Sequence, residues 1–322
     1  MIYNVGILGP GFVATHAVIP ALQRIPQARL LAVASRDSER ASMVSKQFGI
    51  ERAYSDYQAL LDDNDVNAVY IALPNHLHHP WTLRAAEAGK HVLCEKPLAI
   101  NAIECDEMIT ACQNAHVVLM EAVMYRFHPR MLILKQLLEN GELGTLRFLH
   151  LAFSFPFNAP ENYRARREYG GGCLLDVGSY CIHAARWLIA SEPRSIQGFI
   201  RRKDGIDVDT QALLTFDRSV IAHMQCSFAA AEHQVIEVVG STGAVTVPLA
   251  FTAWTGDITT LLLQRGAIFE QKTFAPADPY EAMAAHFIDC MLGKTELCLP
   301  PENSRGTSEV IDQLRQVCVE IS

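Results

Sequence analysis

The sequence lacks the charge clusters and the long apolar runs that mark several classes of protein. It carries 27 Lys and Arg against 35 Asp and Glu, a formal net charge of -8, and its cations are not gathered in any lysine- or arginine-rich run. Binding to nucleic acid or to an anionic membrane depends on clustered cations, so we expect neither partner. No apolar run reaches the roughly 20 residues of a membrane-spanning helix. A small molecule is the expected ligand.

Export signals and cysteine motifs are missing too. The opening residues, MIYNVGILG, show no basic segment, no long apolar segment and no small-residue cleavage site. The nine cysteines are odd in number, and none lies in a CxxC pair or in another spacing typical of zinc ligands. We therefore expect a cytoplasmic protein with reduced cysteines, most of them in its core, and no metal site.

Low-complexity segments and internal repeats are also lacking, and 50% of the residues are hydrophobic. The 322 residues are enough for two globular domains. Over residues 1–122, apolar strand-like runs alternate with helical patterns, which is the rhythm of βαβ units. Strands that are apolar throughout are typical of a parallel sheet covered by helices on both faces. This region is predicted to be an α/β, doubly wound Rossmann domain that binds a dinucleotide at the carboxyl ends of its strands.

The pattern changes from about Leu143, where strand-like runs follow one another without regular helices between them. One helix is expected around residues 177–189, and two more, at 280–292 and 304–321, close the chain. Residues 123–322 are predicted to be an α+β domain for substrate binding and dimerisation, with a large open, mostly antiparallel sheet and a last helix that could return to the first domain. An open sheet must cover one face, which predicts a homodimer; further pairing of dimers is left open.

The segment GPGFVA follows the first strand and opens the first helix, with Gly9, Gly11 and Ala14 in a GxGxxA arrangement. Gly9 permits a tight turn, Gly11 lets the backbone approach a pyrophosphate, and Ala14 allows the helix to pack closely on the strand. The helix N-terminus adds amide donors and a positive dipole. A purely structural turn is the alternative, but the βαβ context favours dinucleotide binding, with Phe12 and Val13 among the contacts.

The end of the second strand predicts which dinucleotide is bound. An acidic residue there would accept from the ribose 2′-hydroxyl and repel a 2′-phosphate, whereas this strand ends ASRD. Ser35 and Arg36 offer a hydroxyl and a planar cation, and Arg40 is a second cation one turn further on. This favours NADP(H). Asp37 could instead accept from the ribose hydroxyl if the loop turned differently. The alternative without a function is that Arg36, Asp37 and Arg40 are only the solvated start of a helix.

The fourth strand ends in LPNHLHHPW, at the same edge of the predicted sheet. We expect Leu73 and Asn75 to contact the cofactor, Asn75 through the ribose, with His78 packed beside it. The three histidines of this segment lie at a helix N-terminus with no carboxylate at ligand spacing, so they do not predict a metal site.

The fifth strand runs into HVLCEKPLA, which places Glu95 and Lys96 at that edge as well. The residue before a proline is pushed towards extended geometry, so Lys96 should leave the strand in a fixed direction. Charges that are simply solvated at a strand end are the alternative.

The segment YGGGCLLDVGSYCIHAARW places Asp176, Tyr180, His183 and Trp187 on one face of a helix. A capping aspartate and ordinary half-buried aromatic residues would explain this face without chemistry. If a nicotinamide supplies the hydride, the protein needs only a group that exchanges the alcohol proton. An ammonium about 4 Å from a phenol contributes roughly 4 kcal/mol towards the phenolate at an effective dielectric of about 20, and desolvation takes back part of it. Lys96 and Tyr180 are therefore the predicted acid-base pair, with Asp176 orienting Lys96 or the substrate hydroxyl.

These motifs, in this order, resemble the glucose-fructose oxidoreductase and inositol dehydrogenase family, often called Gfo/Idh/MocA. The resemblance spans nearly the whole chain and rests on GPGFVA, ASRD, LPNHLHHPWTLRAAEAGKHVLCEKPLA, EAVMYRFHPR and GGGCLLDVGSY. It implies that Pro97 follows a cis bond, as it often does in the family. It also implies that Lys96, Asp176 and the residue four beyond that aspartate serve the substrate. The cofactor contacts that it implies are Gly9, Gly11, Ser35, Arg36, Asn75, Glu95 and Lys96.

Members that resemble inositol dehydrogenase carry histidine at that last position, whereas this chain has Tyr180. The chain is more similar to dimeric dihydrodiol dehydrogenases, xylose dehydrogenases and sugar ketoreductases. Tyr125 departs from that branch, which usually has tryptophan there, and His183 adds a titratable group. The substrate site is expected to include Tyr125, Arg126, Phe155, Arg164, His183 and Trp254.

We expect an NADP(H)-dependent oxidoreductase that moves a hydride between the nicotinamide and a secondary alcohol or ketone of a sugar, cyclic diol, diketone or related small polyol. NAD(H) remains an alternative cofactor. A non-catalytic NADP-binding sensor or regulator is a second function, against which the presence of both Lys96 and Tyr180 counts. A third is a sugar oxidoreductase that cycles a tightly held cofactor, which the missing export signal disfavours. The exact substrate and the direction of reaction stay open.

Overall fold

The computed structural model describes residues 2–321 and divides them into two compact units. The first unit contains the described residues up to Met124 together with Tyr280–Arg305. The second contains Tyr125–Pro279 and the described residues from Gly306 onward. Each unit is therefore built from two separate stretches of the chain.

The expected division lay between residues 122 and 123, with the last helix alone able to pack back on the first domain. The chain passes between the units two residues further on, and Tyr280–Arg305 is grouped with the first unit. Met1 and Ser322, the outer limits of the two expected domains, lie outside the described residues.

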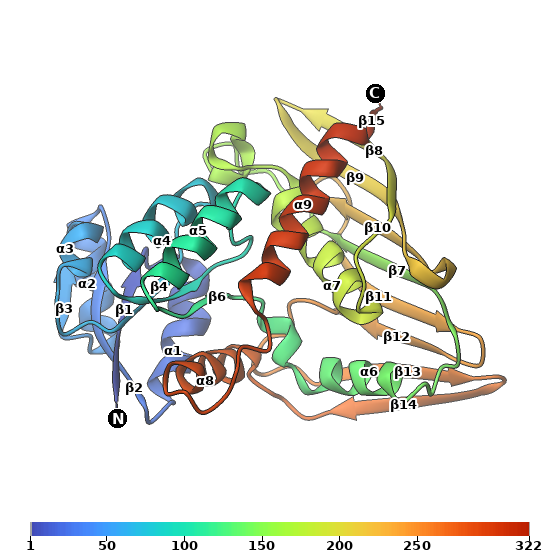
Figure 1. The fold of residues 1–322 in the computed structure, drawn as a ribbon, viewed down its shortest axis with the longest axis horizontal. Helices are drawn as coiled ribbons and strands as arrows, with labels where there is room; N and C mark the ends of the chain where they lie inside the picture. The colour runs from blue at the N-terminus through green and yellow to red at the C-terminus, as the bar shows by residue number, and fades with distance from the viewer. Residues whose placement is uncertain (1, 322) are drawn as a thin grey trace. The chain divides into compact units, whose positions relative to one another are not determined.

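The first unit contains a six-stranded sheet in the order β3-β2-β1-β4-β5-β6, with every neighbouring pair parallel. Its strands are β1 (Tyr3–Leu8), β2 (Ala28–Ala34), β3 (Arg52–Tyr54), β4 (Ala68–Ile71), β5 (His91–Cys94) and β6 (Leu119–Glu121) (Figure 1). This is the strand order of a doubly wound dinucleotide-binding sheet, in which ligands lie at the carboxyl ends of the strands. The α/β prediction for this part of the chain is confirmed.

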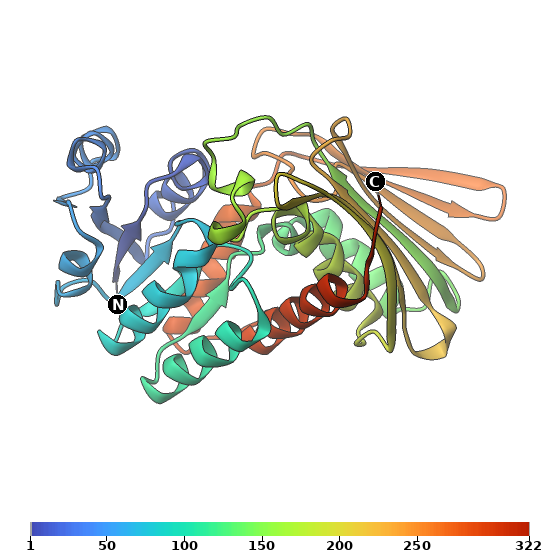
Figure 2. The same cartoon turned by 90° about the horizontal axis from the view of Figure 1, so that it is seen from above.

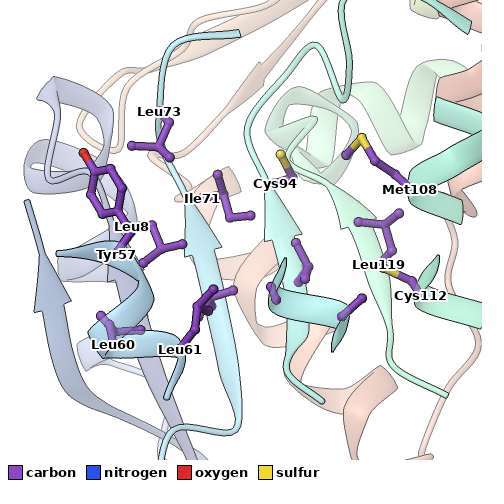
Figure 3. Packing of buried hydrophobic residues seen from close by; sticks show 14 of the residues in the cluster. Leu8, Tyr57, Leu60, Leu61, Ile71, Leu73, Cys94, Met108, Cys112 and Leu119 are labelled. Atoms are coloured by element: carbon purple, nitrogen blue, oxygen red, sulfur yellow. The ribbon is translucent and has the colours of Figure 1, made fainter. Parts of the chain in front are cut away.

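The strands of this sheet are apolar because helices cover their side chains. Ile71, Cys94 and Met108 are completely buried, and Leu119 is nearly so, in one hydrophobic cluster (Figure 3). The helices of this unit are α1 (Ile19–Gln23), α2 (Ser38–Phe48), α3 (Tyr57–Leu61), α4 (His78–Glu87), α5 (Ala102–Asn114) and α8 (Pro279–Met291), of which all but the first residue belongs to this unit.

Local signals in the sequence fix the limits of these helices. The side chain of Asp37 caps α2, and that of Asn101 caps α5 by accepting from the Glu104 N–H. Gly49 ends α2 in the left-handed conformation, at φ 66°, which glycine adopts without strain. Capping side chains therefore set where these two helices begin, and a glycine sets where α2 ends.

The second unit contains a nine-stranded sheet in the order β14-β13-β12-β11-β7-β10-β9-β8-β15. Its pairs are antiparallel except β7 with β10 and β8 with β15. The strands are β7 (Leu146–Ser154), β8 (Ser195–Lys203), β9 (Ile206–Thr215), β10 (Ile221–Ser227), β11 (His233–Gly240), β12 (Ala244–Pro248), β13 (Thr259–Arg265), β14 (Ile268–Phe274) and β15 (Val319–Glu320). The prediction of a large, mostly antiparallel sheet is confirmed.

Helices lie on one face of this sheet. Figure 2 shows α6 (Pro129–Glu139) and α7 (Ser179–Ile189) on the same side of the strands, and α7 packs against β7 and β10. On the opposite face the described part of this unit has no helix (Figure 2). The strand registers put Phe148, Phe199 and Leu213 together on one face of the sheet, where they are about half exposed, at 48%, 54% and 46%. The open sheet face that the sequence predicts is therefore present.

The last helix differs from the prediction. It runs as α9 (Pro301–Val317) rather than over residues 304–321, and the residues after it form the edge strand β15, which pairs with β8. Apolar residues alternate in VCVEI, a period that a strand satisfies as well as a helix end does. None of the helices described over residues 2–321 has the length and apolar character needed to cross a membrane.

Candidate active site

The turn after β1 has the geometry that a dinucleotide needs. Gly9 has a φ of 84°, and a Cβ there would lie 2.6 Å from Leu73 Cδ2 and 2.9 Å from the Ala72 carbonyl oxygen, so no other residue fits. An added Cβ on Gly11 would meet only the Ala72 oxygen, at 3.9 Å, which leaves the space beside this backbone open. A helical turn follows at once, and the first N–H groups of a helix have no acceptor within the helix itself. The turn therefore fits a pyrophosphate.

The charged residues that follow β2 make different contacts. Asp37 Oδ1 accepts from the N–H groups of Glu39 and Arg40, at 3.0 and 3.1 Å, so this carboxylate caps α2. The Arg40 guanidinium donates to the Pro10 carbonyl oxygen at 3.1 and 2.7 Å and thereby holds the glycine turn. Arg36 is exposed at the strand end. Of the two predicted cations, Arg36 is thus exposed and Arg40 is engaged by the backbone.

The end of β4 holds Asn75 and His78, both buried, at 2% and 0% exposure. The His78 ring lies between two backbone carbonyl oxygens, with Nδ1 2.8 Å from that of Pro97 and Nε2 2.8 Å from that of Leu73. Burial lowers the pKa of His78 to about 4, so the ring is neutral at pH 7. Within residues 2–321, no three His, Cys, Asp or Glu side chains are grouped to hold a metal ion.

At the end of β5 the Glu95 carboxylate accepts from the Tyr70 hydroxyl at 2.5 Å and from the Lys96 N–H at 3.2 Å. Burial and the Glu95 charge raise the pKa of Tyr70 well above its ordinary value, which keeps this phenol a proton donor. The Lys96–Pro97 peptide bond is cis, as the resemblance implied. Lys96 thus starts from a backbone whose neighbours are held by hydrogen bonds.

Glu121, at the end of β6, was not among the predicted site residues. It is 4% exposed, and its Oε1 accepts from the Leu98 N–H at 2.8 Å. Burial raises the pKa of Glu121 above its ordinary value. The sequence signal was a carboxylate that ends an otherwise apolar strand beside the lysine strand.

In the second unit the predicted residues Asp176 and Arg164 form an ion pair, with Arg164 Nε 2.7 Å from Asp176 Oδ2. Asp176 is 4% exposed. Burial lowers the pKa of Arg164, but the Asp176 carboxylate has the larger effect, so the pKa of Arg164 is raised above its ordinary value. The sequence predicted both residues without predicting that they pair.

A second carboxylate that the sequence analysis missed holds the triple-glycine segment. Asp207, on β9, accepts from the Leu174 N–H at 2.6 Å. Gly172 has a φ of 109°, and a Cβ there would lie 2.3 Å from Asp207 Oδ1. The triple glycine therefore allows an aspartate to reach the start of the helix that carries Asp176 and Tyr180.

Tyr180 lies among aromatic rings and is 7% exposed. Its ring centre is 5.9 Å from that of Tyr125, 5.5 Å from that of Phe153 and 5.4 Å from that of Phe251. Phe155 extends this cluster through Phe153. Three aromatic rings thus lie beside that of Tyr180, and the Arg164 guanidinium interacts with it electrostatically.

The remaining predicted substrate residues fall into separate groups. His183 is 2% exposed, its Nδ1 lies 2.6 Å from the Tyr125 hydroxyl, and burial lowers its pKa well below the ordinary value. The Arg126 guanidinium lies 4.7 Å from the centre of the Trp187 ring. Trp254 is 41% exposed, and its backbone N–H donates to the Asp257 carboxylate in a tight turn. Tyr125, Tyr180 and His183 therefore form one cluster.

Comparisons with known proteins match both parts of the chain. Residues 3–123 match the oxidoreductase family with an NAD-binding Rossmann fold, and residues 131–246 match the GFO/IDH/MocA C-terminal domain. The chain is 36% identical over 277 residues to D-xylose 1-dehydrogenase (NADP(+)) 2 of Haloferax volcanii, covering 85% of each protein. It is 32% identical over 244 residues to trans-1,2-dihydrobenzene-1,2-diol dehydrogenase of Mus musculus, covering 75% of this chain and 72% of that protein. Its fold is similar to that of a 3-ketoreductase from Actinomadura kijaniata, whose structure was solved in complex with NADP and TDP-benzene. The TM-score is 0.93 at 29% sequence identity, and the match covers 100% of this chain and 99% of that chain.

Proposed function

Because this chain belongs to the Gfo/Idh/MocA family of oxidoreductases, we propose that it transfers a hydride between NADP(H) and a secondary alcohol or ketone of a sugar, a cyclic diol or a related small polyol or diketone. The observation that carries the proposal is the surroundings of Tyr180. Its phenol lies beside three aromatic rings and four residues beyond the buried Asp176, the position that the family resemblance assigns to the substrate, and a phenol can exchange a substrate proton.

The first unit supports NADP(H) as the cofactor. The Gly9 turn suits the pyrophosphate, and Arg36 is exposed at the strand end where a 2′-phosphate would lie. Asp37, the residue that could have favoured NAD(H), is already engaged as the cap of α2. When bound, the nicotinamide supplies or takes up the hydride.

We propose that the protein's own residues handle the proton. Tyr180 gives the proton to the substrate oxygen during reduction and removes it during oxidation. A nearby cation favours the phenolate, and we assign that task to Lys96. Arg164 balances the charge of Asp176. We propose that Asp176 orients Lys96 or the substrate hydroxyl.

His183 is the other titratable group of this cluster. Its ring is neutral at pH 7, because burial lowers its pKa, and Nδ1 is hydrogen-bonded to Tyr125. We propose that His183 fixes the Tyr125 ring beside Tyr180 and takes no part in proton transfer.

The test is turnover of the purified protein with saturating NADPH or NADP⁺ against aldoses, ketosugars, diketones and cyclic diols. Tyr180→Phe keeps the ring and removes the exchangeable proton, so kcat should fall by about 10²–10⁴ with little change in cofactor affinity. Lys96→Met should be at least as damaging, whereas His183→Asn should keep substantial turnover. Near-wild-type activity of Tyr180→Phe would overturn the mechanism. A wild-type protein that binds NADPH tightly but turns over no member of the panel would favour a sensor or regulator.

A further inference from the structure

The peptide group between Pro97 and Leu98 is held at both of its polar ends by buried side chains. Glu121 Oε1 accepts from the Leu98 N–H at 2.8 Å, and His78 Nδ1 lies 2.8 Å from the Pro97 carbonyl oxygen. The two side chains come from the end of β6 and the start of α4. We infer that His78 and Glu121 are positioning residues that together fix the direction in which Lys96 leaves β5, an inference that rests on the role proposed for Lys96.

A single peptide plane is the unit that these contacts control. Its carbonyl and its N–H lie at opposite edges, so two partners on opposite sides prevent the plane from rotating. The plane begins one residue after Lys96, whose own N–H is held by Glu95. The backbone on both sides of the lysine is therefore fixed by polar side chains, the half-buried Glu95 on one side and the buried His78 and Glu121 on the other, and its side chain starts from one orientation.

The two contacts reinforce each other. Donation of the Leu98 N–H to a carboxylate polarises the peptide and makes the Pro97 oxygen a better acceptor. A neutral imidazole carries one N–H, so His78 can donate to only one of its two carbonyl neighbours. The polarised Pro97 oxygen favours the tautomer with the proton on Nδ1. The charged and titratable groups that act on this pair are Lys96 and His76 at His78, and Lys96 and Glu95 at Glu121.

Two buried hydrogen bonds could also act only by stabilising the fold, and that role predicts a different result. Positioning matters for the reaction because a displacement of about 1 Å in a reacting group can cost roughly 10²-fold in rate. It has no effect once the positioned group is gone. The clamp formed by His78 and Glu121 on the Pro97–Leu98 peptide should therefore influence kcat only in the presence of Lys96.

The experiment is a double-mutant cycle measured at saturating NADPH. His78→Leu and Glu121→Leu should each lower kcat by about 10- to 100-fold with the KM for NADPH changed less than about 3-fold. Glu121→Gln keeps an acceptor for the Leu98 N–H and should retain most of the activity. In the Lys96→Met background neither Leu variant should lower the residual rate further.

His91→Gln is the matched control, because His91 lies at the opposite end of β5 and also bonds to backbone, accepting from the Val118 N–H at 2.9 Å. It should lower the melting temperature without lowering kcat. If Glu121→Leu does not fold, Glu121→Asp gives the same test, since it draws the carboxylate one methylene away from Leu98. Nitrogen-15 NMR of labelled histidine should find the His78 proton on Nδ1.

The outcomes separate this inference from the function on which it rests. Unchanged kcat in the His78 and Glu121 variants, with Lys96→Met inactive, would overturn the clamp and leave the proposed function intact. Losses that persist undiminished in the Lys96→Met background would show a structural role only and would also overturn it. A proton on Nε2 would show that His78 holds Leu73 instead of Pro97. Full activity of Lys96→Met would overturn the proposed function itself.

Discussion

Replacing Arg36 by alanine should weaken binding of NADPH far more than binding of NADH. Arg36 is exposed at the end of β2, beside the glycine turn, whereas Arg40 already donates twice to the Pro10 carbonyl oxygen. Arg36→Ala therefore removes the cation best placed for a 2′-phosphate, and Arg40 cannot replace it without releasing the turn.

The magnitude follows from the charges. A 2′-phosphate carries roughly -1.5 to -2 at pH 7, and each unit of charge about 4 Å from a guanidinium contributes about 1 kcal/mol in a water-like environment. A hydrogen bond between charged groups contributes about 1.5–3 kcal/mol, and this figure overlaps with the first. Because Arg36 is exposed, we expect a loss of about 2–3 kcal/mol, which corresponds to a Kd for NADPH roughly 30- to 150-fold higher. The Kd for NADH should change less than about 3-fold, since it lacks the phosphate.

The assay is titration of nicotinamide fluorescence with each cofactor at low and at high salt. The preference for NADPH should shrink as salt screens this exposed contact. Asp37→Ala is the companion variant, because its carboxylate caps α2. It should cost about 1 kcal/mol of stability and leave the ratio of the two affinities unchanged. Equal losses for both cofactors in Arg36→Ala, or a large gain in NADPH preference in Asp37→Ala, would refute this reasoning.

Two further predictions concern assembly and acid stability. The open face of the nine-stranded sheet exposes Phe148 and Leu213, so we expect light scattering to find a dimer at micromolar concentration and Leu213→Glu to dissociate it; a wild-type monomer would contradict this. Asp63 is partly buried, which opposes its charge, but hydrogen bonds led by that from Arg52 hold its pKa below the ordinary 3.8. Its stabilising contribution is complete above that value and is lost as the pH falls through the lower folded-state pKa. The melting temperatures of wild type and Asp63→Asn should therefore differ at pH 7 and converge in strong acid, and a gap that widened with acidity would contradict the assignment.

Local patterns predicted much of this molecule. The apolar strands of the parallel sheet, the glycine turn and the edge that carries Lys96 follow from periodicity and from residues adjacent in sequence. The contacts of Glu121 with Leu98 and of Asp207 with Leu174 do not, because each joins residues that only the tertiary fold brings together.

The sequence also could not predict to which unit each C-terminal helix belongs. An amphipathic helix shows which of its faces is buried but not which sheet buries it. The residues after α9 have an alternation that fits a strand or a helix end, and their pairing with β8 decided between the two.

The discontinuous first unit has a consequence for how the chain is made. The Tyr3 hydroxyl donates to the Met291 carbonyl oxygen, and Arg24 and Asp106 pair with Glu281 and Arg305. Domains usually fold as they leave the ribosome, the N-terminal one first. Here the first strand of the sheet has a partner 288 residues later in the chain, so the nucleotide-binding half reaches its final form only after that later segment has been made, and a fragment cut after Met124 would lack part of its own core.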